Sequence, residues 1–182
     1  MIGLNLAPAL PAADIKVTEI SGTLCVGGVI GANMPVAAAG ENAFTIKETT
    51  TSGSTVRTFK TTAKAGRIKA DGLAGGIIGC VTQNTTLESC TNYGIVSHKS
   101  AAGGIAGWNG GSIKNCSTYA TLGTQQDGYA YLGGIVGINN GTVTDSAPAA
   151  SITVRGRYII GGVAGLNLTK ASITYNTSYS IP

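Results

Sequence analysis

The chain has 182 residues, a single-domain length, and carries a formal net charge of +4. Only 11% of the residues are charged, against about 25% in an ordinary globular domain, whereas 43% are hydrophobic and 28 are glycine. This composition excludes a disordered tail and a collagen helix, and no window holds the roughly 18 consecutive apolar residues of a membrane-spanning helix. It favours many short strands joined by tight corners.

Residues 1–13 (MIGLNLAPALPAA) are apolar but lack the basic start of a secretory signal. Pro8 and Pro11 favour an extended conformation. We interpret this segment as a linker or as a cap on the first coil, and residues 14–182 as one repeat domain. The sequence stops at Ile181-Pro182 within the repeat pattern, so we expect a neighbouring domain or chain to cover the terminal coil.

A five-residue segment, Gly-Gly-apolar-small-Gly, recurs along the chain. Its copies are GGVIG at 27–31, GGIIG at 75–79, GGIAG at 103–107, GGIVG at 133–137 and GGVAG at 161–165. The first glycines lie 48, 28, 30 and 28 residues apart, so a period of 28–30 residues is interrupted once. Such a unit cannot bury its apolar side alone, but stacked units bury a continuous core. We predict an all-β, right-handed parallel β-helix of about five coils with three strands per coil.

The interruption, at about 41–66, departs from the repeat. Residues 43–48 and 55–60 alternate apolar and polar side chains on either side of 51–54, which is typical of a β-hairpin arm with a short turn. An extra irregular coil is the alternative interpretation.

Basic residues gather in this arm. Arg57, Lys60 and Lys64 belong to a run of positive charge that continues to Lys69, and they are candidate contacts for a partner. Phe59 is the one aromatic residue nearby, too few for the stacking surface of a nucleic-acid site.

Equivalent positions in stacked coils form columns along the stack. Three apolar columns are expected to face inward: Val29, Ile77, Ile105, Ile135 and Val163; Leu87, Ile113, Val143 and Ile173; and Val96, Leu122 and Ile152. A corner column holds Asn33, Asn109, Asn139 and Asn167, interrupted by Val81. Side-chain amides stacked at the strand spacing can hydrogen-bond along such a ladder, so we assign these asparagines a structural role.

The four cysteines are Cys25, Cys80, Cys90 and Cys116, without a Cys-x-x-Cys pair and with a single histidine, His98. This set lacks the usual ligand spacing of a zinc site, and we expect no metal or other cofactor. Cys90 and Cys116 fall in one column of adjacent coils, about 4.8 Å apart, which is within the range of a disulfide. A buried thiol ladder is the interpretation we favour.

Tyrosines form another column, in which Ala149 interrupts Tyr93, Tyr119 and Tyr179. Such a stripe is either an outward platform for a glycan or a host protein, or a cap on a corner of the core.

Catalysis finds little support in the pattern. No two carboxylates fall at one column in adjacent coils, as a paired-acid glycosidase would need, and His98 has no Ser or Cys at a matched column. Thr142/Thr144 and Ser172/Thr174 look like outward pairs of an ice-binding rod, but Glu88 and Lys114 interrupt that column.

The segments GGIVGINNGTVTDS (133–146) and GGIAGWNGGSIKNC (103–116) resemble the GLUG repeat of bacterial secreted and surface proteins. The resemblance covers residues 72–182 well and 21–40 weakly, because Asn33-Met34-Pro35 breaks the first unit. It implies a β-solenoid in an extracellular bacterial protein, often adhesin-like or a non-catalytic region of a surface protease. We therefore expect a structural or adhesive module that is not an enzyme; a specific glycan- or host-protein-binding module is the alternative.

Overall fold

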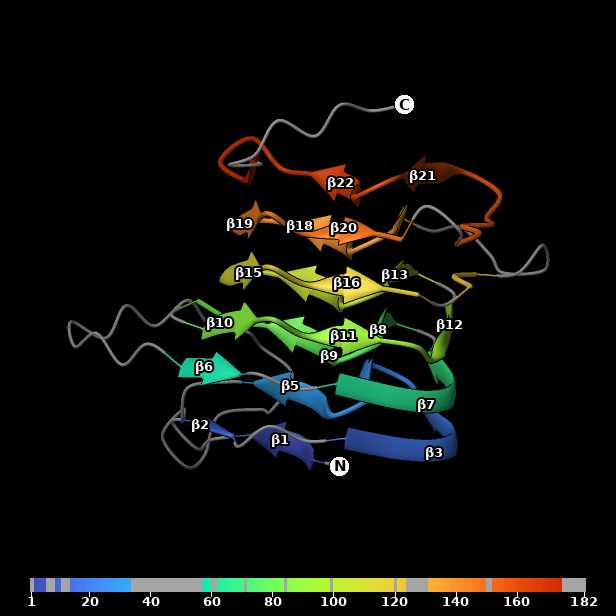
Figure 1. Cartoon of the computed structure of the whole chain (residues 1–182). Helices are drawn as coiled ribbons and strands as arrows, with labels where there is room; N and C mark the ends of the chain where they lie inside the picture. Colours follow the sequence, from blue (N-terminus) through green and yellow to red (C-terminus); the bar gives the residue numbers. More distant parts are fainter. Residues whose placement is uncertain are drawn as a thin grey trace.

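The computed structural model describes residues 2–5, 9–10, 14–33, 57–59, 62–70, 72–83, 85–98, 100–119, 121–123, 131–149 and 152–174. Within these ranges the regular elements are short β-strands, and the strands of successive turns lie above one another (Figure 1). Every strand pair is parallel and in register. The chain is therefore an all-β stack of parallel sheets, consistent with a parallel β-solenoid.

Four sheets run the length of the stack. Sheet 1 contains β1 (Ile2–Asn5), β5 (Ile30–Asn33), β9 (Ile78–Val81), β14 (Ala106–Asn109), β18 (Val136–Asn139) and β22 (Ala164–Asn167). Sheet 2 contains β2 (Ala9–Leu10), β6 (Arg57–Phe59), β10 (Thr85–Glu88), β15 (Ser112–Lys114), β19 (Thr142–Thr144) and β23 (Ser172–Thr174).

The other two sheets complete each turn. Sheet 3 contains β3 (Asp14–Gly22), β7 (Thr62–Ala70), β11 (Thr91–Asn92), β12 (Ile95–His98), β16 (Ser117–Thr118) and β20 (Ala147–Pro148). Sheet 4 contains β4 (Cys25–Gly27), β8 (Leu73–Gly75), β13 (Ala101–Gly103), β17 (Tyr131–Gly133) and β21 (Ile159–Gly161). Coils 1 to 5 begin at β1, β5, β9, β14 and β18, and coil 6 begins at β22.

Two parts of the sequence-based prediction, the number of sheets and the arm, need revision. Each turn is divided over four sheets rather than three, because the residues just before Gly-Gly form a strand of their own. In the predicted arm, Arg57–Phe59 is not half of a hairpin: it pairs in parallel with β2 and β10, and β7 pairs with β3 and β11. The first predicted hairpin strand, 43–48, lies outside the described residues.

The N-terminal segment also takes part in the stack. Ile2–Asn5 pairs with β5 and Ala9–Leu10 pairs with β6, so residues predicted to form a linker or cap contribute the first strands of coil 1.

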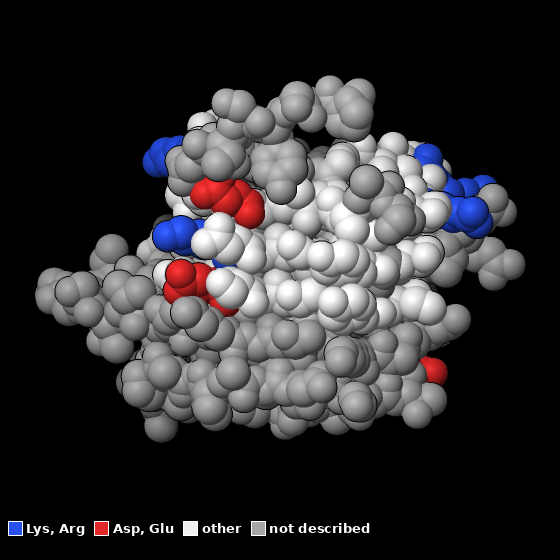
Figure 2. Space-filling view, viewed as in Figure 1, with Lys and Arg blue, Asp and Glu red and all other residues white. Residues whose placement is uncertain are grey.

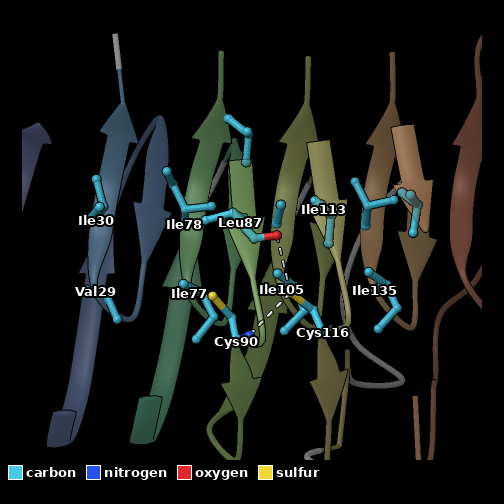
Figure 3. Packing of buried hydrophobic residues seen from close by; sticks show 14 residues of the cluster. Val29, Ile30, Ile77, Ile78, Leu87, Cys90, Ile105, Ile113, Cys116 and Ile135 are labelled. Atoms are coloured by element: carbon cyan, nitrogen blue, oxygen red, sulfur yellow. Dashed lines mark hydrogen bonds between the residues drawn. The ribbon is translucent and has the colours of Figure 1, made fainter. Parts of the chain in front are cut away.

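Two apolar clusters fill the interior. The larger one contains the columns that begin at Val29 and Leu87 together with Cys90 and Cys116, which line up from coil to coil in Figure 3. The smaller one, between sheets 3 and 4, contains Val26, Ala74, Ala102, Leu132, Val96 and Leu122. In the third predicted column the partner of Leu122 is Val154 rather than Ile152. Leu122 follows its register residue Ser117 by five positions, whereas Val154 follows the equivalent Ala147 by seven, so coil 5 is longer here.

The Gly-Gly pair is required by the corner between sheets 4 and 1. A Cβ on Gly75 would collide with the carbonyl oxygen of Ile78, three residues further along the chain, and a Cβ on Gly76 would collide with the carbonyl oxygen of Gly104, one coil further along the stack. The motif therefore recurs because two backbones approach closely at every turn.

A second corner, between sheets 2 and 3, uses one left-handed residue in each of coils 3, 4 and 5. Ser89, Asn115 and Asp145 occupy equivalent positions with φ of 56°, 51° and 49°. Asparagine and aspartate tolerate this conformation better than most residues, which explains their presence in the repeat.

Candidate functional site

The asparagine column of sheet 1 forms a hydrogen-bonded ladder. The Nδ2 of Asn109 donates to the Oδ1 of Asn139 at 2.8 Å, and the Nδ2 of Asn139 donates to the Oδ1 of Asn167 at 2.8 Å. The Oδ1 of Asn109 accepts the backbone N–H of Gly111 at 3.1 Å, and the Oδ1 of Asn139 accepts that of Gly141 at 3.3 Å. Asn109 and Asn139 thus each hold the corner of their own coil and bind the next coil.

Asn33 extends this column by register only. Its backbone pairs with Asn5 and Val81, and its side chain lies outside the described residues. A buried amide that the sequence analysis did not single out, Asn92, bridges coils in sheet 3. Its Nδ2 donates to Gly94 O at 2.9 Å and to Thr118 Oγ1 at 3.3 Å.

Cys90 and Cys116 are thiols buried in adjacent coils. The backbone N–H of Cys90 donates to the Sγ of Cys116 at 3.4 Å, and the N–H of Cys116 donates to the Oγ of Ser146 at 3.0 Å. The side-chain hydrogen bond with Cys90, together with burial, raises the pKa of Cys116 well above its ordinary value. A buried thiol with a raised pKa is a poor nucleophile, so this column serves packing and hydrogen bonding.

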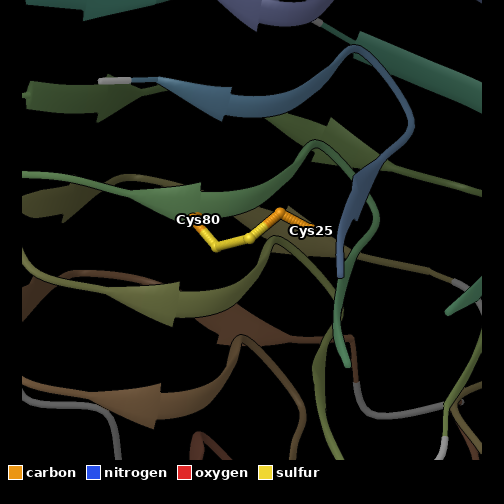
Figure 4. Close-up of a disulfide and its surroundings, with 2 residues drawn as sticks. All are labelled: Cys25 and Cys80. Carbon is orange, nitrogen blue, oxygen red and sulfur yellow. A yellow bond between two sulfur atoms is a disulfide. The ribbon is translucent and has the colours of Figure 1, made fainter. Parts of the chain in front are cut away.

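The disulfide joins the other two cysteines, a pairing that the sequence analysis did not identify. Cys25 of sheet 4 is bonded to Cys80 of sheet 1, with Cα atoms 5.9 Å apart (Figure 4). The bond therefore links coil 1 to coil 3.

Register could have indicated this pair. One coil further along, the equivalent residues are Leu73 and Trp108, and after them Ala101 and Ile138. Sheets 1 and 4 are in contact along these columns. The pair could have been found by comparing a column of sheet 4 with the column of sheet 1 that faces it. Comparison of residues within one column does not detect it.

Two of the three predicted tyrosines are stacked on the surface. The rings of Tyr93 and Tyr119 lie with centroids 5.0 Å apart and planes 15° apart. Tyr93 is 48% exposed and Tyr119 is 52% exposed. Each ring covers one face of the other, so the two rings do not form a single flat platform. Tyr179 lies outside the described residues.

The side chains of the predicted basic contacts lie outside the described part of the structure. Arg57 lies in β6 and Lys64 in β7, where only the backbone is described, and Lys60 lies outside the described residues. Figure 2 shows a largely uncharged central surface with charged side chains at its two sides. Glu88 and Lys114 are register partners on the outer face of sheet 2.

In the described part of the chain, no three His, Cys, Asp or Glu side chains gather in a way that could hold a metal ion. The same residues include no helix long and apolar enough to cross a membrane. No protein-family model matches the chain, and neither does any curated protein or solved structure.

Proposed function

We propose that the chain is a non-catalytic structural repeat module that acts as a stalk or scaffold in a bacterial cell-surface or secreted protein. The observation that carries this proposal is that the recurring residues are used for stacking. The paired glycines allow the corner, the asparagines form the ladder, and the apolar columns fill the core. Because the repeated residues serve packing, the stack is suited to act as a rigid support whose outer side chains recur at a fixed spacing.

The finer form of the proposal is a right-handed solenoid of the GLUG type. The motif resemblance in 103–116 and 133–146 supports this assignment, and the general preference of parallel crossovers supports the handedness. The disulfide between Cys25 and Cys80 supports an extracellular or cell-surface location, because cytosolic thiols are kept reduced.

The exposed tyrosine pair favours one alternative, a glycan- or host-protein-binding module. Half-exposed aromatic rings are common in binding surfaces. The stacked arrangement of Tyr93 and Tyr119 argues against a sugar ring lying flat across both, since their mutual faces are covered.

The test compares binding with mechanical behaviour. The protein is probed on a glycan array and on host matrix proteins beside the double variant Tyr93→Ala/Tyr119→Ala, with Thr91→Ala/Ser117→Ala on the same face as the control. It is then pulled through its two ends in a single-molecule experiment.

A scaffold is expected to show no saturable binding and to unfold in steps of about one coil, roughly 100 Å of extended chain per 28–30 residues. Saturable binding that disappears only in the tyrosine variant would replace this proposal with the binding-module alternative.

A further inference from the structure

The last strand of sheet 4 in the described part of the chain, β21, has an apolar open edge. It pairs with β17 on one side only. In the inner coils the residues at its second position, Ala74, Ala102 and Leu132, are fully buried. In β21 the equivalent residue, Ile160, is 44% exposed, and Ile159 beside it is 48% exposed. The difference is the cover that another strand provides in the inner coils.

In the part of the chain that the structure describes, no strand lies against the corner glycine that follows β21. A Cβ on Gly76, Gly104 or Gly134 would collide with the carbonyl oxygen of the matching glycine in the next coil. A Cβ on Gly162 would meet no atom within 4 Å. In the coil below, Gly134 donates its N–H to Gly161 O at 3.1 Å. The Gly162 N–H lies at the position that would donate in the same way to an added strand.

Positive charge flanks the edge. Arg155 and Arg157 are exposed, and so is Tyr158, which leads directly into β21. An acidic side chain ahead of an incoming strand would therefore meet a favourable field.

We propose that the edge formed by Ile159–Gly161 and Gly162 captures an extended segment of a partner protein as an added parallel strand. The segment has the order acidic, any residue, two apolar residues and two glycines. Its apolar pair covers Ile159 and Ile160, in the register that Leu132 keeps with Ile160, and its first glycine carbonyl accepts from Gly162. Its acidic residue lies beside Arg157. Unpaired strand edges are templates for this kind of addition, and the coil-to-coil interface shows which side chains fit. This goes beyond the scaffold role, because it gives the module a partner.

The test uses a fluorescein-labelled peptide, Glu-Ala-Tyr-Leu-Gly-Gly-Ile-Val, which is segment 130–136 of the chain preceded by glutamate. Binding to the whole chain is followed by fluorescence anisotropy. We expect saturable binding that weakens with added salt and that a scrambled peptide does not reproduce.

Gly162→Ala is the decisive variant. The added methyl has open space in the free protein, so the thermal midpoint is expected to stay unchanged, but it blocks the incoming carbonyl and should weaken binding at least about tenfold. Gly3→Ala is the matched control, because a Cβ on Gly3 also meets nothing within 4 Å but lies in β1, at the other end of the stack. Arg157→Glu should weaken binding and remove most of its salt dependence.

Equal binding by wild type and Gly162→Ala, or by the scrambled peptide, would overturn the proposal. So would the absence of saturable binding. If the chain itself self-associates in sedimentation and Gly162→Ala abolishes that association, the occupant is a second copy and the partner-peptide proposal is wrong. None of these outcomes bears on the pulling experiment, so the scaffold proposal is tested separately.

Discussion

The structural role of a residue in this chain depends on its position in the turn. Ile135 lies in an inward column with no exposed surface, whereas Thr144 lies outside, in register with Lys114 and Thr174. Asn115 and Asp145 turn a corner in the left-handed region. These roles recur every 28–30 residues, so the role of one residue predicts the role of the equivalent residue in another coil.

The inward and outward columns predict opposite responses to one substitution. Ile135→Asp places an isolated carboxylate in a dry core and should cost at least about 3 kcal/mol, a large fraction of the roughly 5–15 kcal/mol that stabilises an ordinary domain. Thr144→Asp should change the free energy of unfolding by less than about 0.5 kcal/mol. Urea unfolding followed by circular dichroism measures both. Similar losses in the two variants would mean that the columns are assigned to the wrong faces.

The buried thiol of Cys116 predicts a pH effect. Its pKa is raised in the folded protein by the Cys90 side chain and by burial, so the unfolded chain releases this proton at lower pH than the folded chain does. Its contribution to stability is complete below the ordinary thiol pKa of about 8.5 and is lost as pH rises above that value.

Cys116→Ser removes this titration, and Ser146 shows that a hydroxyl fits the same column. The fall in unfolding free energy between about pH 8 and pH 11 should therefore be smaller in Cys116→Ser than in the wild type. Equal slopes in the two proteins would mean that the thiol ionises as easily in the folded state.

At the scale of strands, the sequence predicted the columns better than it predicted the turn. The Gly-Gly period places β9, β14, β18 and β22 in register, because the same close backbone approach recurs at each corner. The strands of sheet 4 were missed because three residues beside a glycine pair carry no alternation of their own. Strand β6 was assigned to a hairpin because alternating residues suit a hairpin and a stacked coil equally well.

Some features of the candidate site could be predicted from a single column, and others could not. The asparagine ladder follows from one column read along the stack, and its hydrogen bonds lie where that reading places them. The disulfide and the open edge of β21 depend on which sheets face each other and where the stack ends. Those relations arise from the complete turn and are not contained in any one column.

The disulfide between β4 and β9 predicts a large stability term. Closing a loop with a sequence separation of 55 residues lowers the entropy of the unfolded chain, a term of about 4 kcal/mol in the loop-closure model. Cys25→Ser/Cys80→Ser should lose about this amount in denaturant unfolding, and a reducing agent should have little further effect on the variant. A loss below about 1 kcal/mol would show that the unfolded chain is already constrained in this region.

At the scale of the whole molecule, the stack has an inside and two ends. The N–H of Ile105 donates to Ile135 O at 2.9 Å, and the N–H of Ile135 donates to Val163 O at 2.9 Å. Val163 occupies the same position in the last described coil, where the apolar residues are only partly buried.

Hydrogen exchange should follow this gradient. The amides of Ile105 and Ile135 should exchange at least about a hundredfold more slowly than that of Val163, because terminal coils open locally at lower cost. Exchange measured by NMR tests this, with Ile77, which donates its N–H to Ile105 O, as a second internal reference. Uniform exchange along the column would mean that the stack opens only as a whole.

The bond from Cys25 to Cys80 also limits how far the chain can be extended. In a stack whose coils touch only their neighbours, each coil can leave from either end in turn, as in a one-dimensional chain of coupled units. The bond closes a loop that contains β5, β6, β7 and β8, whereas β1 to β3 precede it and the coils after Cys80 follow it. Strands can therefore leave from both ends, but the residues between the two cysteines cannot be stretched out while the bond is intact. Under tension the fully extended protein is shorter by the length of this loop, and reduction of the one bond would release it.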